Sequence, residues 1–312
     1  MPRNYGLGSR NMGIAGKFAL NNAVKNGGVS FSTAATNGSR WRIFTVWAAK
    51  NGVKKMEQVN QYLVKKYGCE LAESVNAGTL SAATAQVYVS AINTIMSIAT
   101  KRKWESISPT KDCLIPQRSA IRQVSPGALD AMAYYRALKN VHEEVGARAA
   151  AVVALARELG LRSKEASLLD ARTALAQAKT CRSATVIYGT KGGRVRDVPI
   201  ITPKQLLALE HAARAQGTDR SMIPSDQSWK KWRSGELRIA RELVKNHTAG
   251  GLHDLRAAFA CQRYEEETGC AAPVTGGSIL DKRKDMEARL VISKELGHGR
   301  PEIVSEYIGG RR

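Results

Sequence analysis

Apolar residues recur at helical spacing through the first hundred positions of the chain. The stretch 31–49 holds its aromatic and aliphatic side chains in helical register, and 56–64 predicts a shorter helix. Ser81 is a good N-cap for a third helix, in which apolar side chains recur at spacings of four, four and three: Val87, Ala91, Ile95 and Ile98. The pattern predicts an all-helical first domain.

The second half of the chain opens with two further helical patterns. Ser125 and Pro126 favour the start of a helix that runs to Leu138. The alanine-rich stretch 147–159 predicts a buried helix that Gly160 ends. Most of the chain beyond residue 200 also has helical periodicity.

One segment departs from this helical pattern. Residues 183–188 and 194–200 predict two strands, because a glycine-rich turn separates two short runs that contain β-branched side chains. The expected fold class is therefore mainly α-helical with a small antiparallel β-sheet, a helical domain preceding an α+β domain.

Residues 105–126 have the most linker-like composition, with three prolines among serine, threonine and basic residues. A chain of 312 residues also favours two domains over one. We expect three parts: a basic flexible arm over 1–28, a helical domain over 29–115, and an α+β domain over 116–312.

The chain is strongly basic, with 48 Lys and Arg against 27 Asp and Glu and a formal charge of +21. Such an excess favours a polyanion as partner, because each neutralised phosphate releases condensed counterions. The same charge would also suit binding to an anionic membrane surface. It is also compatible with a basic soluble protein that has no polyanionic partner. Residues 1–56 hold nine basic residues and no acidic one, which suits a DNA-contacting arm better than a transit peptide.

Other function classes are disfavoured. The longest apolar run, 149–156, is eight residues, whereas a membrane span needs about 20, and no signal-peptide pattern opens the chain. Five cysteines without a Cys-x-x-Cys pair fit reduced thiols better than disulfides or a zinc site. We therefore expect a cytoplasmic protein with no metal and no cofactor.

Four separate segments carry candidate chemistry, and each is weak alone. In 158–169, a glycine stop places Arg162 at the start of a helix, and Glu165 one turn on can orient its guanidinium. Alone, this segment fits a surface Arg–Glu pair better. In the hairpin turn, flanking glycines let Lys191 reach into a groove, although basic turns are common and usually solvated.

The other two segments lie toward the end of the chain. In 250–259, His253 and Arg256 are three apart on one helix face, so both can meet one phosphate. In 292–309, His298 follows a glycine and Tyr307 lies nine positions on. A single tyrosine on an amphipathic helix is usually a core or rim residue.

Together these segments resemble the conserved boxes of the tyrosine recombinase (phage integrase) family. They match, in family order, an arginine box, a hairpin lysine, a His-x-x-Arg box and a Leu-Gly-His box followed by the nucleophilic tyrosine. The resemblance covers residues 125–312, and the helical segment before it is similar to the family's SAM-like core-binding domain. By resemblance, Glu165 supports the catalytic set, which is Arg162, Lys191, His253, Arg256, His298 and Tyr307.

The resemblance implies an enzyme that cleaves and rejoins DNA through a 3′-phosphotyrosyl intermediate, for integration or excision of a mobile element. Tyr307 would attack, His253 would accept or relay its proton, and Lys191 would protonate the departing 5′ oxygen. Arg162, Arg256 and His298 would stabilise the charged transition state, as a metal ion does in other phosphoryl-transfer enzymes.

The same resemblance implies the partners and the location. We expect double-stranded DNA carrying recombination sites, a homotetramer on DNA that forms a Holliday junction, and a monomer or weak oligomer without DNA. Accessory DNA-bending or directionality proteins are possible partners, no membrane is expected, and the location would be the bacterial cytoplasm at the nucleoid.

Basic residues outside the boxes are candidates for binding the DNA backbone. Residues 229–241 predict a basic helix anchored by Trp229 and Trp232, which suits a phosphate-facing helix better than a solvated face. The full set of expected DNA contacts is Arg40, Arg42, Lys101, Arg102, Lys103, Arg194, Arg196, Lys230, Lys231 and Arg233.

Two features depart from the family pattern. The stretch between the third and fourth boxes is long, and its residues 265–289 form an insert that we interpret as a surface loop rather than a subunit contact. The five residues after Tyr307 are too few for the helix with which many relatives dock on a neighbouring protomer. How the subunits couple is therefore open.

Two alternatives stay open at this point. A type IB topoisomerase uses a similar tyrosine and two arginines but relaxes supercoils without a partner site. A non-catalytic DNA-binding descendant of a recombinase would need no intact active site. The separate helical domain, the spacing of the boxes and the six intact residues favour a recombinase.

Overall fold

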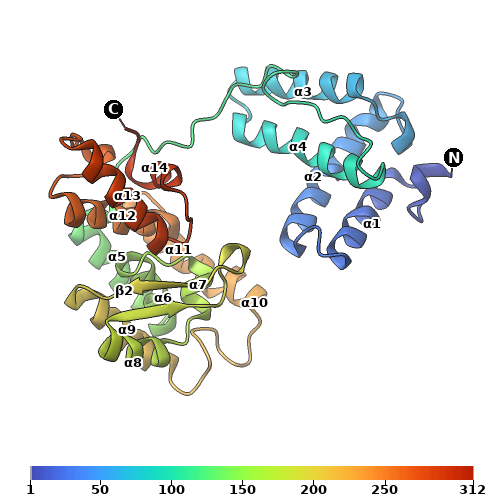
Figure 1. The fold of residues 1–312 in the computed structure, drawn as a ribbon. Helices are drawn as coiled ribbons and strands as arrows, with labels where there is room; N and C mark the ends of the chain where they lie inside the picture. The colour runs from blue at the N-terminus through green and yellow to red at the C-terminus, as the bar shows by residue number, and fades with distance from the viewer. Residues whose placement is uncertain (1, 312) are drawn as a thin grey trace. The chain divides into compact units, whose positions relative to one another are not determined.

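A computed structural model describes residues 2–311 and divides the chain into two compact units, one ending at Ser119 and the other beginning at Ala120 (Figure 1). The first unit is all-helical in its described residues, and the second combines helices with one two-stranded antiparallel sheet. The predicted fold class is confirmed.

The first unit places four α-helices around an aromatic core. Each helix begins where a side chain accepts a backbone N–H of the first turn, as an N-cap does: Asn11, Ser30, Asn60 and Ser81. The elements are η1 (Arg3–Gly6), α1 (Met12–Lys25), α2 (Phe31–Lys50), η2 (Met56–Gln58), α3 (Gln61–Asn76) and α4 (Ala82–Ala99).

The expected flexible arm over residues 1–28 is not what the structure shows. Residues 12–25 form α1, and Met12, Ala15 and Leu20 are buried in the core of the first unit. The Trp41 indole N–H on α2 donates to the Met12 carbonyl at 3.0 Å. A Cβ on residue 16 would lie 2.1 Å from Trp41 Nε1, so this close approach requires Gly16. The absence of acidic residues suggested a flexible arm, although this segment also has an apolar helix face that packs in the core.

The second unit contains the remaining elements. They are η3 (Gly127–Leu129), α5 (Ala131–Glu144), α6 (Ala147–Glu158), α7 (Ser163–Leu168), α8 (Ala171–Cys181), β1 (Ser183–Val186), η4 (Lys191–Gly193), β2 (Arg196–Pro199), α9 (Pro203–Gln216), α10 (Trp229–Ser234), α11 (Glu236–Thr248), α12 (Leu252–Thr268), η5 (Pro273–Thr275), α13 (Lys282–Glu295), η6 (Pro301–Val304) and α14 (Ser305–Ile308).

Helix α6 lies at the centre of the second unit, in contact with α5, α9 and α12. All eight residues from Ala149 to Ala156 are buried, because small alanine side chains let helices approach on every side. The helix expected to begin at Ser125 begins instead at Ala131, where the Asp130 carboxylate accepts the N–H groups of Met132 and Ala133.

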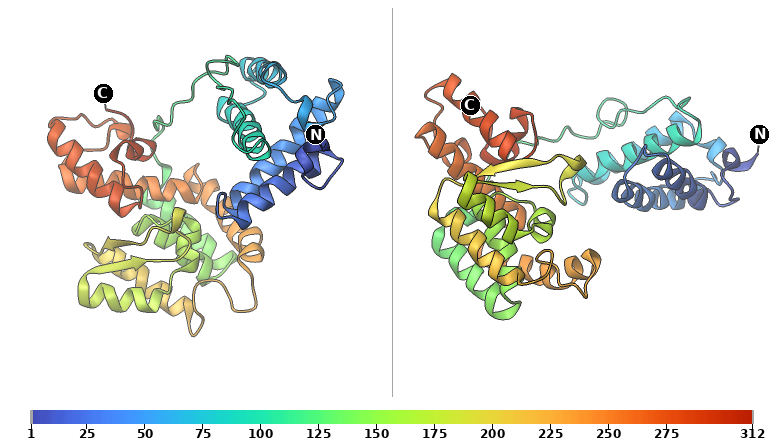
Figure 2. Two further views of the ribbon diagram at one scale, coloured as in Figure 1. Left: turned by 45° about the vertical axis from the view of Figure 1, so that its right-hand side comes forward. Right: turned by 60° about the horizontal axis from the view of Figure 1, so that its bottom comes forward.

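The hairpin lies beside α8, as Figures 1 and 2 show. Its register pairs Ser183 with Pro199 and Val186 with Arg196. Side chains alternate between the two faces of β2, so Arg196 and Val198 both point inward while Asp197 is exposed. The turn between the strands carries η4.

The insert over 265–289 is not a surface loop throughout. Its first residues continue α12 to Thr268, and its last belong to α13, where Asp285 and Arg289 are each 1% exposed. Only the stretch 269–281 connects the two helices, and it contains η5. The expectation of a surface loop was wrong at both ends of the insert, and the charges of Asp285 and Arg289 are tolerated inside the unit because they pair with each other.

Candidate active site

The first element of the site is the turn that joins α6 to α7. Gly160 has a φ of +63°, and a Cβ there would lie 2.4 Å from the Phe259 ring, so glycine is required. Arg162 then begins α7. The Glu165 carboxylate accepts the Arg162 backbone N–H at 2.8 Å and its Nη1 at 2.7 Å. The guanidinium is thus fixed while the side chain stays 21% exposed.

Glu165 is fully buried and is held by a second arginine. Arg196 donates from Nη1 and Nη2 to the two carboxylate oxygens, at 3.1 and 2.7 Å. Burial alone raises the pKa of Glu165, but the hydrogen bonds and charge of Arg196, together with the charge of Arg162, lower this pKa to about 2. Glu165 is therefore an ionised support for both arginines.

This pairing corrects the assignment of Arg196 to the DNA-binding set. Its side chain is 8% exposed, and its Nε donates to the Glu295 carbonyl at 2.7 Å. All three guanidinium nitrogens are thus engaged inside the protein. Arg196 is a structural partner of Glu165 that links the hairpin to α13.

Arg256, on α12, joins three segments of the site. Its Nη1 donates to the Gly160 carbonyl, its Nη2 to the Leu296 carbonyl at 2.5 Å, and its Nε to the Tyr307 hydroxyl at 3.3 Å. The side chain is completely buried, and this burial lowers the pKa of Arg256 to about 10, which still leaves it charged at neutral pH. It brings a positive charge to the Tyr307 oxygen.

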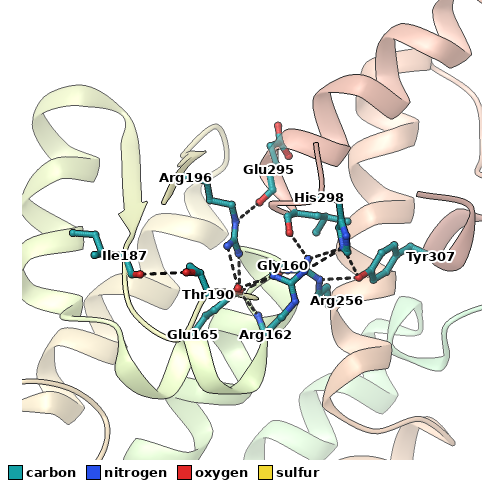
Figure 3. Close-up of polar contacts among 11 residues, drawn as sticks. Gly160, Arg162, Glu165, Ile187, Thr190, Arg196, Arg256, Glu295, His298 and Tyr307 are labelled. Atoms are coloured by element: carbon teal, nitrogen blue, oxygen red, sulfur yellow. Dashed lines mark hydrogen bonds and ion pairs between the residues drawn. The ribbon is translucent and has the colours of Figure 1, made fainter. Parts of the chain in front are cut away.

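Tyr307 lies on α14 and its hydroxyl contacts His298 Nε2 at 2.9 Å (Figure 3). Arg162 Nη2 and Arg256 Nη2 also lie 3.2 and 3.3 Å from the same nitrogen. Guanidinium nitrogens only donate, so His298 Nε2 is the acceptor and its proton sits on Nδ1. The tyrosine hydroxyl therefore donates to His298 and accepts from Arg256.

Burial and the nearby positive charges keep the His298 ring neutral. Burial lowers the pKa of His298, and the nearby charges of Arg256, Arg162 and Lys191 lower it further, to about 3. A neutral imidazole with an unprotonated Nε2 can accept a proton from the hydroxyl that contacts it.

His253 and Lys191 complete the predicted set at the edge of this cluster. The His253 ring lies 5.3 Å from the Tyr307 ring, centroid to centroid. Although His253 is exposed, surrounding protein atoms remove part of its hydration and lower its pKa, with the charge of Arg256 acting in the same direction. Lys191 is exposed in the hairpin turn, near enough to influence His298.

The remaining basic candidates differ in their surroundings. Arg42 is exposed on α2 and Arg40 is half-buried there. Arg194 is exposed and donates to the His298 carbonyl at 3.0 Å, so it borders the site. The rest are exposed, three in the turn after α4 and three on α10: Lys101, Arg102, Lys103, Lys230, Lys231 and Arg233.

The expected basic helix over 229–241 is two helices, α10 and α11, separated at Gly235. Trp232 is its anchor, with 2% exposure and an indole N–H that donates to Ser167 Oγ at 3.0 Å. Its neighbours Lys230, Lys231 and Arg233 point outward from this anchor. The arrangement presents three positive charges on a short helix fixed to α7.

Two contacts near the site have no local signal in the sequence. Arg122, from the stretch predicted to be a linker, donates its backbone N–H to the Ser305 carbonyl at 2.9 Å. Its Nη2 contacts the carboxylate of Asp254, the neighbour of His253. The second contact is the pair formed by Asp285 and Arg289 below α14. The Arg122 contact joins positions 132 residues apart, and the Asp285–Arg289 pair, although four residues apart on α13, is buried only because the fold covers it.

Within residues 2–311, no group of three or more His, Cys, Asp and Glu side chains is arranged to hold a metal ion. In the same part of the chain, no helix combines the length and apolarity that crossing a bilayer demands.

Comparisons with known proteins agree with this geometry. Residues 117–262 match a family model described as Integrase. No curated protein matches the chain. Among solved structures, a lambda integrase dimer bound to a COC′ core site is 16% identical, with a TM-score of 0.57, over 94% of this chain and 77% of that one.

Two further structures are similar over most of their lengths. The Tn1549 transposon integrase in complex with circular intermediate DNA is 12% identical, with a TM-score of 0.60, over 97% of each chain. A lambda integrase tetramer bound to a Holliday junction is 16% identical, with a TM-score of 0.57, over 98% of this chain and 80% of that one.

The fold is that of the solved integrases, and within it the chain brings Arg162, Arg256, His298 and Tyr307 together. Both comparisons make this chain similar to the integrases, over residues 117–262 by family model and over nearly its whole length by fold.

Proposed function

We propose that this protein is a tyrosine site-specific recombinase, and that it cuts DNA by attack of the Tyr307 hydroxyl on a backbone phosphorus. The observation that carries the proposal is the Tyr307 hydroxyl held between His298 Nε2 at 2.9 Å and Arg256 Nε at 3.3 Å. In the step, a bond forms from the tyrosine oxygen to phosphorus, and the bond from phosphorus to the 5′ oxygen breaks. The products are a 3′-phosphotyrosyl link and a free 5′ hydroxyl.

The proton of the nucleophile passes first to His298. We expected His253 in that role, but the hydroxyl contacts His298, and His253 approaches only ring to ring. His253 then relays or accepts the proton on the open side of the site. Lys191, on a glycine-flanked turn, protonates the departing 5′ oxygen, and rejoining reverses each transfer.

Arg162 and Arg256 stabilise the charge that develops on the phosphate oxygens. Both are fixed before the reaction, Arg162 by Glu165 and Arg256 by two backbone carbonyls, so little reorganisation is needed when the charge appears. Guanidinium groups offer paired donors to phosphate oxygens, which a lysine does not match. Because the phosphotyrosyl link retains the energy of the phosphodiester, rejoining needs no nucleotide cofactor.

The substrate in this proposal is double-stranded DNA carrying recombination sites, and the reaction serves integration or excision of a mobile element. The charge of +21 supports a DNA partner. The lambda relative forms a tetramer on a Holliday junction, and we extend that assembly to four copies of this chain, a monomer or weak oligomer without DNA. Accessory DNA-bending or directionality proteins, acting at the bacterial nucleoid, belong to the same proposal.

The test is strand exchange between two DNA sites. Duplexes tiled across the DNA that flanks the gene are incubated in pairs with the protein, and recombinant products are scored alongside relaxation of a supercoiled plasmid. We expect exchanged products from the wild type and none from Tyr307→Phe, with DNA binding unchanged. Relaxation without exchange for any pair would favour a topoisomerase, and binding without either reaction would favour a non-catalytic protein.

A further inference from the structure

The nucleophile of the proposed reaction lies on a helix too short to fix its own position. Helix α14 has four residues, Ser305–Ile308, whereas isolated helices below about 12 residues are marginal in water. The position of the Tyr307 hydroxyl therefore depends on what holds α14 from outside.

A buried arginine of the insert contacts α14 on both sides of the tyrosine. Arg289, on α13, donates from Nη1 to Ser305 Oγ at 3.0 Å and to the Gly309 carbonyl at 3.3 Å. These acceptors lie two residues before and two residues after Tyr307. One guanidinium thus spans the turn that carries the nucleophile.

Arg289 is itself held by Asp285. Its Nε donates to Asp285 Oδ1 at 2.8 Å, and the Tyr264 hydroxyl donates to the same oxygen at 3.0 Å. Both charged residues are 1% exposed. Buried ion pairs are weak evidence for stability, because desolvation offsets much of their attraction, so their use here favours a role in fixing geometry.

The second oxygen of Asp285 binds the chain just beyond the nucleophile. Arg311 Nε lies 2.8 Å from Asp285 Oδ2, while the Arg311 side chain stays 46% exposed. The segment 305–311 is therefore tied to the insert at Ser305, Gly309 and Arg311.

We infer that Asp285, Arg289 and Arg311 form a clamp that positions Tyr307 for attack, so the insert takes part in catalysis through the nucleophile. These three are positioning residues, since none of them touches the site where the phosphate would bind. The inference rests on the proposed function, because it assigns these residues to the same reaction.

The clamp is tested by single-turnover cleavage of nicked duplexes, which trap the covalent adduct. The duplexes are tiled across the DNA that flanks the gene. Arg311→Ala removes a half-exposed partner and Ser305→Ala removes one acceptor, so both variants should fold. We expect each to lower the cleavage rate at saturating DNA, Arg311→Ala on the order of tenfold, with full amplitude, unchanged DNA affinity and unchanged melting temperature. Arg311→Lys should recover most of the rate.

Arg283→Ala is the matched control, because Arg283 is an exposed arginine of α13 whose ion pair is with Glu287. It should cleave at the wild-type rate. If the wild type forms an adduct and both Arg311→Ala and Ser305→Ala match or exceed its rate, the clamp is wrong and the proposed function stands. A lower amplitude at an unchanged rate overturns the clamp as well, because it indicates partial unfolding. If the wild type forms no adduct on any duplex, the proposed function fails and takes the clamp with it.

Discussion

Arg196 donates to both carboxylate oxygens of Glu165, at 3.1 and 2.7 Å, from a strand 31 positions further along the chain. This bidentate pair is buried, and it sets the carboxylate that in turn orients Arg162. The hairpin therefore does more than carry Lys191 on its turn. Its Arg196 also supplies the charge that keeps Glu165, the support of Arg162, ionised.

Replacing Arg196 should destabilise the protein. Arg196→Met leaves the Glu165 carboxylate buried without its bidentate partner, and breaking a buried pair in this way costs about 3–5 kcal/mol. The free energy of unfolding, measured by urea denaturation, should fall by that amount. Arg194→Met, two positions earlier and exposed, should change it by less than about 0.5 kcal/mol. Equal effects from the two variants would refute the role assigned to Arg196.

Lowering the pH should reduce the free energy of unfolding through two groups, His298 and Glu165, and both contributions have the same sign. The pKa of His298 is lowered from 6.5 to about 3, so as pH falls below 6.5 the unfolded chain binds a proton that the folded site does not. The pKa of Glu165 is lowered from 4.5 to about 2, so its contribution is present above pH 4.5 and is lost as pH falls toward 2.

The two steps separate in thermal unfolding followed against pH. Between pH 6.5 and 4.5, His298→Asn should have a smaller loss of melting temperature per pH unit than the wild type, because the variant lacks this proton linkage. Below about pH 3, where His298 is protonated in the folded protein as well, the two proteins should fall in parallel. An identical slope for both proteins in the upper range would show that His298 is not held neutral.

Cleavage activity should not titrate with a histidine of ordinary pKa. The pKa of His298 is lowered to about 3, so its ring is neutral at pH 6.5 and above, and the pKa of His253 is lowered as well. The single-turnover cleavage rate of the wild type is measured against pH at saturating DNA, with His298→Asn and His253→Asn alongside. The wild-type profile should therefore contain no inflection near pH 6.5 that can be assigned to either histidine by its loss in the matching variant. Such an inflection would mean that a protonated histidine takes part.

The basic face of α10 should bind DNA backbone without sequence preference. Lys230, Lys231 and Arg233 are exposed beside the buried Trp232 anchor. Their joint replacement by alanine should weaken binding and reduce the slope of log K against log salt by about 0.9 for each phosphate that the variant no longer neutralises. Lys139→Ala, an exposed lysine of α5 paired with Glu143, should leave the slope unchanged. An unchanged slope in the triple variant would exclude α10 from the interface.

Much of the fold follows from local pattern. Ser81 begins α4 as expected, and the hairpin strands lie within the predicted ranges. The structure also gathers Arg162, Arg256, His298 and Tyr307 in one hydrogen-bonded cluster. Their catalytic roles stay predictions that the experiments above address.

The misplaced residues share a physical cause. Arg196 was assigned to DNA because its charge suggests exposure, yet alternation along β2 turns it inward toward Glu165. Asp285 and Arg289 lie in the stretch interpreted as a surface loop, yet they are buried, with partners from α12, α14 and Arg311. In both cases segments distant in the chain cover the charge and supply hydrogen-bond partners, and a local pattern does not identify those segments.

The account depends most directly on which atom of the protein bonds to DNA. A nicked duplex from the flanking DNA, labelled at the phosphate to be attacked, is incubated with the protein, and the adduct is digested and mapped by mass spectrometry. The labelled phosphate is expected on the peptide containing Tyr307, attached through its 3′ linkage. An adduct on any other residue, or an equal adduct yield from Tyr307→Phe, would contradict the central claim.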